Sequence, residues 1–131
     1  MKMKIRQGDV YWVDMDKVFP DLPHYQKGIR PCLVISNNYQ NTYSDMINII
    51  PLTSKYDGLP QHRFIYVRNT RNYLLPEMTT TINISLILKK MGYVSEGYIQ
   101  QALKSISIQF DMERSRKYVD RRTKEFSGKK S

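Results

Sequence analysis

The chain has 131 residues, 40% of them hydrophobic and 25% charged, which suits one domain with a core of its own. Lysine and arginine outnumber aspartate and glutamate by 21 to 12, and the resulting net charge of +9 favours a polyanionic partner. One cysteine and two histidines exclude an intramolecular disulfide scaffold and a tetrahedral Cys/His zinc site, and the singly scattered carboxylates give no support to a two-metal nuclease centre.

Five segments rich in β-branched and aromatic residues predict strands before residue 90. In chain order they are residues 8–15, 30–36, 46–52, 62–68 and 79–85. Proline, glycine and polar turn residues between them predict connections at 16–28, 37–45 and 55–60. The first connection is long for so small a domain, and long ordered loops often carry function.

The spacing of apolar residues changes after Gly92 and predicts a C-terminal helix. Ser95 can cap the N-terminus of this helix. The apolar residues that follow recur at helical spacing: Ile99, Ala102, Leu103, Ile106 and Phe110. We interpret this stripe as core or as a dimer interface, and we expect a second short helix to start near Leu86.

Strands followed by one helix predict an α+β fold, a small antiparallel barrel or curled sheet packed by a helix. We place this domain at residues 1–110 and a basic C-terminal extension at residues 111–131, where eight Lys or Arg accompany four Asp or Glu. No apolar run exceeds four residues and the N-terminal stretch lacks an apolar signal core. We therefore expect a cytoplasmic protein without a membrane partner.

Several motifs, in this order along the chain, carry a family resemblance. They are residues 8–12 (GDVYW), 28–36 (GIRPCLVIS), 51–54 (PLTS), 81–83 (TIN) and 99–103, which has the form I-x-x-A-L. The series resembles the MazF/PemK (Kid) family of toxins from type II toxin–antitoxin modules over about residues 6–110. The resemblance implies a small SH3-like antiparallel β-barrel with a C-terminal amphipathic helix, assembled as a homodimer.

The resemblance also implies an activity. Most members of the family are endoribonucleases, or mRNA interferases, that cut single-stranded RNA at short sequences without a metal ion or other cofactor. The ribose 2′-hydroxyl attacks the neighbouring phosphate, which leaves a 2′,3′-cyclic phosphate and a free 5′-hydroxyl. A cognate antitoxin inhibits such a toxin by laying an acidic C-terminal segment over the RNA groove.

The motifs, matched residue by residue, place Arg30 and Thr53 on the active-site arginine and threonine of the family. His24 and Glu77 fall where members keep a functional histidine and a functional acid, so the resemblance implies four catalytic residues. We expect RNA contacts from the loop 16–28 and from the segments around 55–62 and 76–81, with these RNA-binding residues: Tyr25, Gln26, Lys27, Ser54, Lys55, Tyr56 and Thr80. The chain departs from the family pattern at Thr80, where an arginine is usual, and at Tyr25, where an acidic residue is usual.

These residue types suit a reaction that needs a base, an acid and positive charge around a phosphorane. Arg30 can hold the scissile phosphate through its planar guanidinium. Because arginine keeps its proton at ordinary pH, it is a stabiliser of charge, and a candidate proton donor to the leaving oxygen, but not a general base. Thr53 can donate a hydroxyl hydrogen bond to a phosphate oxygen. The ordinary pKa of histidine, about 6.5, suits His24 to proton transfer at neutral pH, and Glu77 is a candidate base or a contact to a base edge.

Each of these assignments has a structural alternative. Arg30 can be a surface arginine before a strand, and Thr53 with Ser54 can cap a turn. His24 and Glu77 can be solvated side chains that take no part in chemistry.

Four other residues are interpreted as structural. His62 lies at the start of a predicted strand, and Cys32 stands in an apolar run as a small buried hydrophobe. Trp12 and Tyr66 are expected in the core.

Two other functions stay open at the level of sequence. One is a CcdB-like toxin that inhibits a protein with the same barrel, and the other is an RNA-binding module without catalysis. The presence of Arg30 and Thr53 within their motifs favours the ribonuclease.

Overall fold

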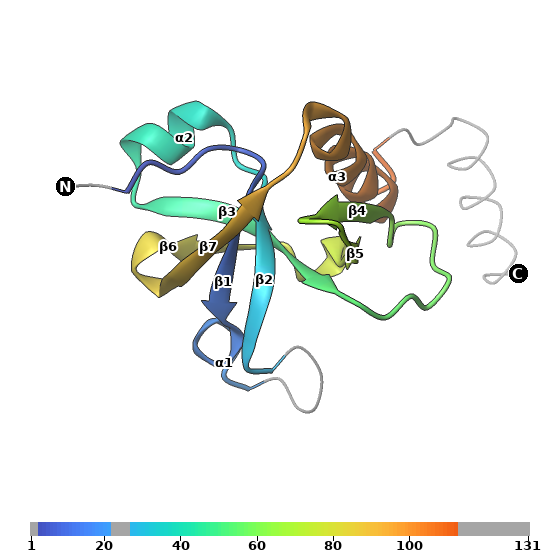
Figure 1. Cartoon of the computed structure of the whole chain (residues 1–131), viewed down its shortest axis with the longest axis horizontal. Helices are drawn as coiled ribbons and strands as arrows, with labels where there is room; N and C mark the ends of the chain where they lie inside the picture. The colour runs from blue at the N-terminus through green and yellow to red at the C-terminus, as the bar shows by residue number, and fades with distance from the viewer. Residues whose placement is uncertain (1–2, 22–26, 113–131) are drawn as a thin grey trace, which may run out of the picture.

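The computed structural model describes residues 3–21 and 27–112. Within them the chain forms one strongly curled antiparallel sheet with its longest helix laid against it (Figure 1). The strands are β1 (Asp9–Asp14), β2 (Ile29–Val34), β3 (Met46–Thr53), β4 (Phe64–Val67), β5 (Thr70–Leu74), β6 (Thr80–Asn83) and β7 (Ile87–Tyr93). They pair in the order β4-β5-β3-β2-β1-β7, and β6 pairs with the first half of β3. This curled half-barrel with a C-terminal helix confirms the predicted α+β fold.

Three α-helices and two single-turn 3-10 helices connect or follow the strands in the described chain. They are α1 (Met15–Val18), α2 (Asn38–Tyr43), η1 (Pro76–Met78), η2 (Ile84–Leu86) and α3 (Glu96–Gln109). The C-terminal helix begins after Ser95 as predicted, although the Ser95 side chain makes no capping hydrogen bond. No helix among the described residues has both the length and the apolar character needed to span a bilayer.

Two segments predicted as irregular contain short helices. The segment 37–45 contains α2, because the Asn37 side chain caps it by accepting a hydrogen bond from the Gln40 backbone N–H at 2.9 Å. The predicted loop 16–28 begins within α1. The Asp14 side chain caps this helix by accepting a hydrogen bond from the Asp16 backbone N–H. In both cases a side chain satisfies a backbone donor that a turn would leave to water.

Strands β5 and β7 have no counterpart among the predicted strands. β4 and β5 are joined by a two-residue turn in which Arg68 and Asn69 have φ of 49° and 66°. Two successive positive φ values match the right-handed twist of a hairpin. The helix expected near Leu86 is wrong, because only the single turn η2 ends there and the chain continues as β7, which pairs with β1.

The two faces of the sheet carry separate apolar clusters. Because side chains alternate along a strand, Tyr11 and Cys32 point into one cluster while Val10 and Leu33 point into the other. The helix α3 covers the second cluster with its buried Ala102. The sheet therefore has a core on each side, and its exposed functional groups lie at strand ends and in connections.

The core differs from prediction at two positions. Trp12 and Tyr66, predicted as core, are only half-buried, and Tyr11 takes the core position on β1. In the apolar stripe interpreted as core or dimer interface, Leu103 of α3 and Phe110 at its C-cap are 40% and 60% exposed, so these two lie outside the core. Cys32 is fully buried as predicted, and burial raises the pKa of its thiol to about 12.

Gly8 joins the sheet to α3 at a point where the backbone needs glycine. Its φ is +96°, and a Cβ at this position would lie 2.7 Å from Cδ1 of Ile99 on α3. The Gly8 N–H donates to the Val34 carbonyl and the Gly8 carbonyl accepts from the Val94 N–H, each at 2.9 Å. The same residue thus holds the start of β1, the end of β2 and the approach to α3.

Candidate functional site

Two of the residues implied to be catalytic lie at one end of β2 and β3. The last pair of the β2–β3 ladder is Cys32 with Pro51, and Arg30 and Thr53 each lie two residues beyond it on their strands. A step of two residues keeps a side chain on the same face of a strand. Arg30 and Thr53 therefore face the same side of the sheet on neighbouring strands, just where the ladder stops.

Arg30 is exposed, and the backbone before it helps to orient its guanidinium. Its Nε donates a hydrogen bond to the Lys27 carbonyl at 3.0 Å. Within the described chain, no other hydrogen bond or ion pair engages the two Nη groups of Arg30. Lys27 is exposed beside it. The strand start thus offers two cations and a planar donor fork to an anion.

Thr53 is half-buried and ends β3. Its Oγ1 accepts a hydrogen bond from the Lys55 backbone N–H at 3.2 Å, which is the turn contact considered as the alternative to a phosphate contact. A hydroxyl that accepts from one group keeps its own proton for another acceptor. The turn contact therefore leaves Thr53 able to donate to a phosphate oxygen.

The segment after Thr53 is exposed and contains Tyr56, an aromatic residue whose ring is stacked on another ring. Ser54 and Lys55 are exposed, and Tyr56 is 56% exposed although its ring stacks on Tyr73 with centroids 4.7 Å apart. Tyr73 pairs with Thr53 across the β3–β5 ladder. The stacked rings thus stand next to Thr53, and the uncovered area of Tyr56 can take a further planar group.

Glu77 is held by a histidine. Both of its carboxylate oxygens lie 2.8 Å from Nε2 of His62, and Nδ1 of the same ring lies 2.7 Å from Oδ1 of Asp57. His62 is 4% exposed, which confirms its structural interpretation. Burial lowers the pKa of His62, but hydrogen bonds and charges from Glu77 and Asp57 outweigh it and raise the pKa above its ordinary value. Glu77 is therefore an ion-pair partner of His62, while 38% of its side chain stays exposed to solvent.

Among the remaining predicted residues, the structure describes only Thr80, which lies farther from Arg30 and Thr53. Thr80 opens β6 and pairs with Ile49, four residues before Thr53 on β3, which is about 13 Å along the strand. His24, Tyr25 and Gln26 lie outside the described residues. The structure thus brings Arg30 and Thr53 to one end of the sheet and Thr80 to the same face, farther along.

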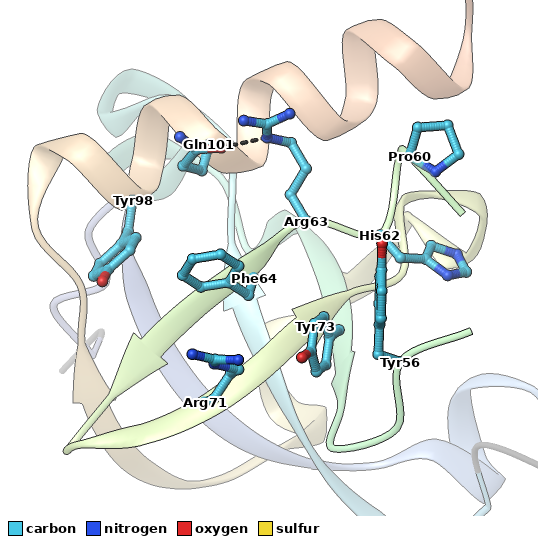
Figure 2. A pocket seen from close by; sticks show the side chains of 9 residues that line it. All are labelled: Tyr56, Pro60, His62, Arg63, Phe64, Arg71, Tyr73, Tyr98 and Gln101. Carbon is cyan, nitrogen blue, oxygen red and sulfur yellow. Dashed lines mark hydrogen bonds between the residues drawn. The ribbon is translucent and has the colours of Figure 1, made fainter. Parts of the chain in front are cut away.

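An open pocket of about 660 Å³ lies at the stacked rings of Tyr56 and Tyr73 (Figure 2). It is lined by Tyr56, Pro60, His62, Arg63, Phe64, Arg71, Tyr73, Tyr98 and Gln101. The Arg71 guanidinium lies 4.9 Å from the centre of the Phe64 ring and donates to the Tyr66 hydroxyl at 2.7 Å, while Arg63 Nε donates to Gln101 on α3. The pocket is therefore both aromatic and cationic.

Sequence reasoning misses this pocket because it does not predict β5. The alternation of Phe64 and Tyr66 is visible, but without the hairpin turn at 68–69 nothing places Arg71 and Tyr73 beside them. The signal that could have found them is Arg68-Asn69 between two strand-like runs, since asparagine tolerates positive φ.

The comparisons with known proteins agree with this architecture. Residues 6–110 match the model of a family described as PemK-like, MazF-like toxin of type II toxin–antitoxin system. The endoribonuclease MazF of Staphylococcus saprophyticus is 27% identical over 110 residues, which cover 79% of this chain and 89% of that protein.

Solved structures share the fold at low sequence identity. MazF from Deinococcus radiodurans has a TM-score of 0.69 and 17% identity, and the match covers 84% of this chain and 99% of that one. An endoribonuclease in complex with its cognate antitoxin from mycobacterial species has a TM-score of 0.64 and 15% identity, with 84% and 96% covered. Because the family model spans most of the residues and the same half-barrel recurs in these structures, the chain belongs to the PemK-like, MazF-like family of type II toxin–antitoxin toxins.

Proposed function

We propose that this protein is an endoribonuclease toxin that cleaves single-stranded RNA at specific short sequences. The observation that carries the proposal is the position of Arg30 and Thr53 on one face at the shared end of β2 and β3. The relatives from Staphylococcus saprophyticus and mycobacterial species are named endoribonucleases, which supports it.

In the proposed reaction the substrate supplies its own nucleophile. The 2′-oxygen forms a bond to phosphorus as the bond to the 5′-oxygen breaks, so the products are a 2′,3′-cyclic phosphate and a 5′-hydroxyl. Arg30 stabilises the charge on the phosphorane and Thr53 donates to a phosphate oxygen. We assign proton transfer to His24, with Glu77 as the second candidate, and this route uses no metal ion.

We propose that the segments next to Arg30 and Thr53 contact the RNA. Lys27 stands beside Arg30, and Ser54, Lys55 and Tyr56 follow Thr53 on an exposed segment. Neighbouring cationic and aromatic side chains suit single-stranded RNA, because its phosphates pair with the charges and its bases stack on the rings. Thr80, Tyr25 and Gln26 complete the proposed set.

Two protein partners are part of the proposal. A cognate acidic antitoxin competes with RNA for the cationic surface at Arg30 and Lys27, as suggested by the net charge of +9 and by the relatives solved in complex with an antitoxin. A second copy of the chain forms a homodimer, for which the exposed Leu103 on α3 and Phe110 directly after this helix supply apolar surface. We further propose that the protein acts in the cytoplasm, with residues 1–110 as the toxin domain and 111–131 as a basic extension.

The test is cleavage of a long single-stranded RNA in EDTA, with the new 5′ ends mapped by sequencing. Wild type is expected to cut at discrete sites, and Arg30→Ala or Thr53→Ala to lose on the order of 10²–10³ in rate. Arg6→Ala and Thr70→Ala, which change the same residue types at exposed positions, are the matched controls.

Two outcomes would contradict the ribonuclease. Intact RNA with tight binding would indicate an RNA-binding module without catalysis. Growth arrest with intact cellular RNA would indicate a toxin that inhibits a protein.

A further inference from the structure

A buried histidine joins two carboxylates on opposite sides of its ring. Asp57 lies 2.7 Å from Nδ1 of His62 and Glu77 lies 2.8 Å from Nε2. An ionised carboxylate can only accept, so both ring nitrogens must carry a proton to keep both hydrogen bonds. The geometry thus fits an imidazolium ring between two ionised carboxylates, and we name Asp57–His62–Glu77 the ionic clasp.

The clasp restrains residues 54–61, a segment with few other contacts to the rest of the fold. Residues 54–61 form no strand or helix, and every hydrogen bond that the structure gives them stays within residues 53–62. The bond from His62 to Glu77 carries the restraint across to η1. Beside it, the stacking of Tyr56 on Tyr73 holds the segment to β5.

The segment so fastened includes the proposed RNA contacts that follow Thr53. We propose that His62 is a positioning residue, which in its protonated form holds residues 54–61 against η1 so that Lys55 and Tyr56 stand beside Thr53 to receive RNA. The role toward RNA rests on the proposed function, whereas the clasp itself does not. Loss of the ring proton turns one nitrogen into an acceptor that faces an anion, and that arm of the clasp opens.

Charged and titratable groups from several elements face the same pocket as His62. Arg63 and Arg71 line it, together with Tyr56 from the 54–61 segment, Tyr73 from β5 and Tyr98 from α3, and the Asp57 and Glu77 carboxylates lie on the two ring nitrogens. Histidine is the side chain whose ordinary pKa lies near neutrality, and the proposed RNA site has a second one in His24. The pH dependence assigned to His62 is therefore the part of the change in RNA affinity that His62→Gln removes.

The first experiment examines the clasp without RNA. Long-range ¹H–¹⁵N spectra of the full chain at pH 7 are expected to show both His62 ring nitrogens protonated, with loss of one proton at higher pH. In Asp57→Asn, which keeps an acceptor oxygen but removes the charge, the His62 titration is expected at lower pH. A neutral His62 ring at pH 7 would overturn the clasp.

The second experiment measures affinity for a short RNA made uncleavable by a 2′-deoxy sugar at the cut site. Wild type is expected to bind about tenfold or more weakly, measured as Kd, as pH rises through the His62 titration, because a charge-assisted hydrogen bond is broken. His62→Gln is expected to bind weakly at all pH values, while Glu96→Gln, an exposed carboxylate change on α3, follows wild type. In cleavage, His62→Gln is expected to raise KM more than it lowers kcat.

The outcomes separate the two proposals. An RNA affinity that does not change through the His62 titration, or that is equal in His62→Gln and wild type, would overturn the positioning role. Should His62→Gln fail to fold, Asp57→Asn supplies the same comparison, because its loss of affinity is expected at the lower pH of its His62 titration. Absence of RNA binding by wild type at every pH would overturn the proposed function and the positioning of RNA contacts, while the ring spectra still decide the clasp.

Discussion

At the scale of single residues, backbone conformation gives Gly8 its importance. A φ of +96° is strained for any residue with a Cβ, and Ile99 of α3 occupies the space that a Cβ would enter. Gly28 has a φ of +74° but nothing within 4 Å of the corresponding position. Both glycines therefore have a backbone conformation that disfavours other residues, but only at Gly8 would an added Cβ also collide with a neighbouring side chain.

Gly8→Ala is expected to lower the free energy of unfolding by about 1–2 kcal/mol through backbone strain, with a further loss as Ile99 shifts. Gly28→Ala is the matched control and is expected to show the strain alone. Urea unfolding of both variants measures the difference. Equal losses would show that the contact with Ile99 adds nothing.

The positions of Arg30 and Thr53 were predictable, because their motifs overlap predicted strands, and the register of β2 and β3 puts both residues on one face. Their part in the chemistry stays a prediction. The partners of His62 did not follow, because Asp57 and Glu77 reach it only through the path of an irregular segment and of η1. No periodicity in the sequence encodes that path.

At the scale of elements, the two helix starts at Asn37 and Ser95 are held differently. The Asn37 side chain accepts from the Gln40 backbone N–H at 2.9 Å, whereas the Ser95 side chain makes no such bond. The longer α3 has its apolar contacts with the sheet to hold it, while α2 is six residues long and depends more on its cap.

Asn37→Ala is expected to cost about 1 kcal/mol of stability, and Ser95→Ala distinctly less, because only the first substitution removes a capping hydrogen bond. Chemical denaturation followed by circular dichroism gives both values. A larger loss for Ser95→Ala would contradict the assignment of the caps.

The elements that sequence predicted are those with strong periodicity. Predicted strands match β1, β2, β3, β4 and β6, and the apolar spacing after Ser95 matches α3. The polar segment that forms α2 has no apolar period, so its helix depends on a cap and on contact with β3. β7 escaped prediction as a strand because its lysines interrupt the alternation expected of one.

At the scale of the whole molecule, the ionic clasp ties stability to pH over a limited window. The raised pKa of His62 means that its contribution is full below about 6.5 and is lost as pH rises through the raised value. The pKa of Asp57 is lowered, first by the hydrogen bond from the Leu59 backbone N–H and also by His62. Its contribution is therefore present above the ordinary value of 3.8 and lost as pH falls through the lowered one.

The difference in unfolding free energy between wild type and His62→Gln is therefore expected to be largest near pH 5–6 and to shrink toward pH 9. Urea unfolding at a series of pH values measures it. A difference that grows with rising pH would have the wrong sign for a protonated histidine.

The basic extension, residues 111–131, is expected to affect how strongly the chain binds RNA but not where it cuts. A chain ending at Phe110 is expected to cut the same sites as the full chain, because the proposed RNA-binding residues lie before that position. Its RNA affinity is expected to depend less steeply on salt, by about 0.7 in the logarithmic slope for each phosphate that the extension would otherwise neutralise. Altered cut sites in the folded, shortened chain would place part of the specificity in residues 111–131.

The burial of Cys32 has a practical consequence for following the molecule at work. Its side chain is fully buried, and burial raises the pKa of the thiol to about 12, so little of the reactive thiolate forms near neutral pH. We therefore expect alkylating reagents and mild oxidants to leave Cys32 unmodified in the folded protein. A cysteine introduced by Ser54→Cys, beside the proposed RNA site, takes a maleimide probe on its own without prior removal of Cys32.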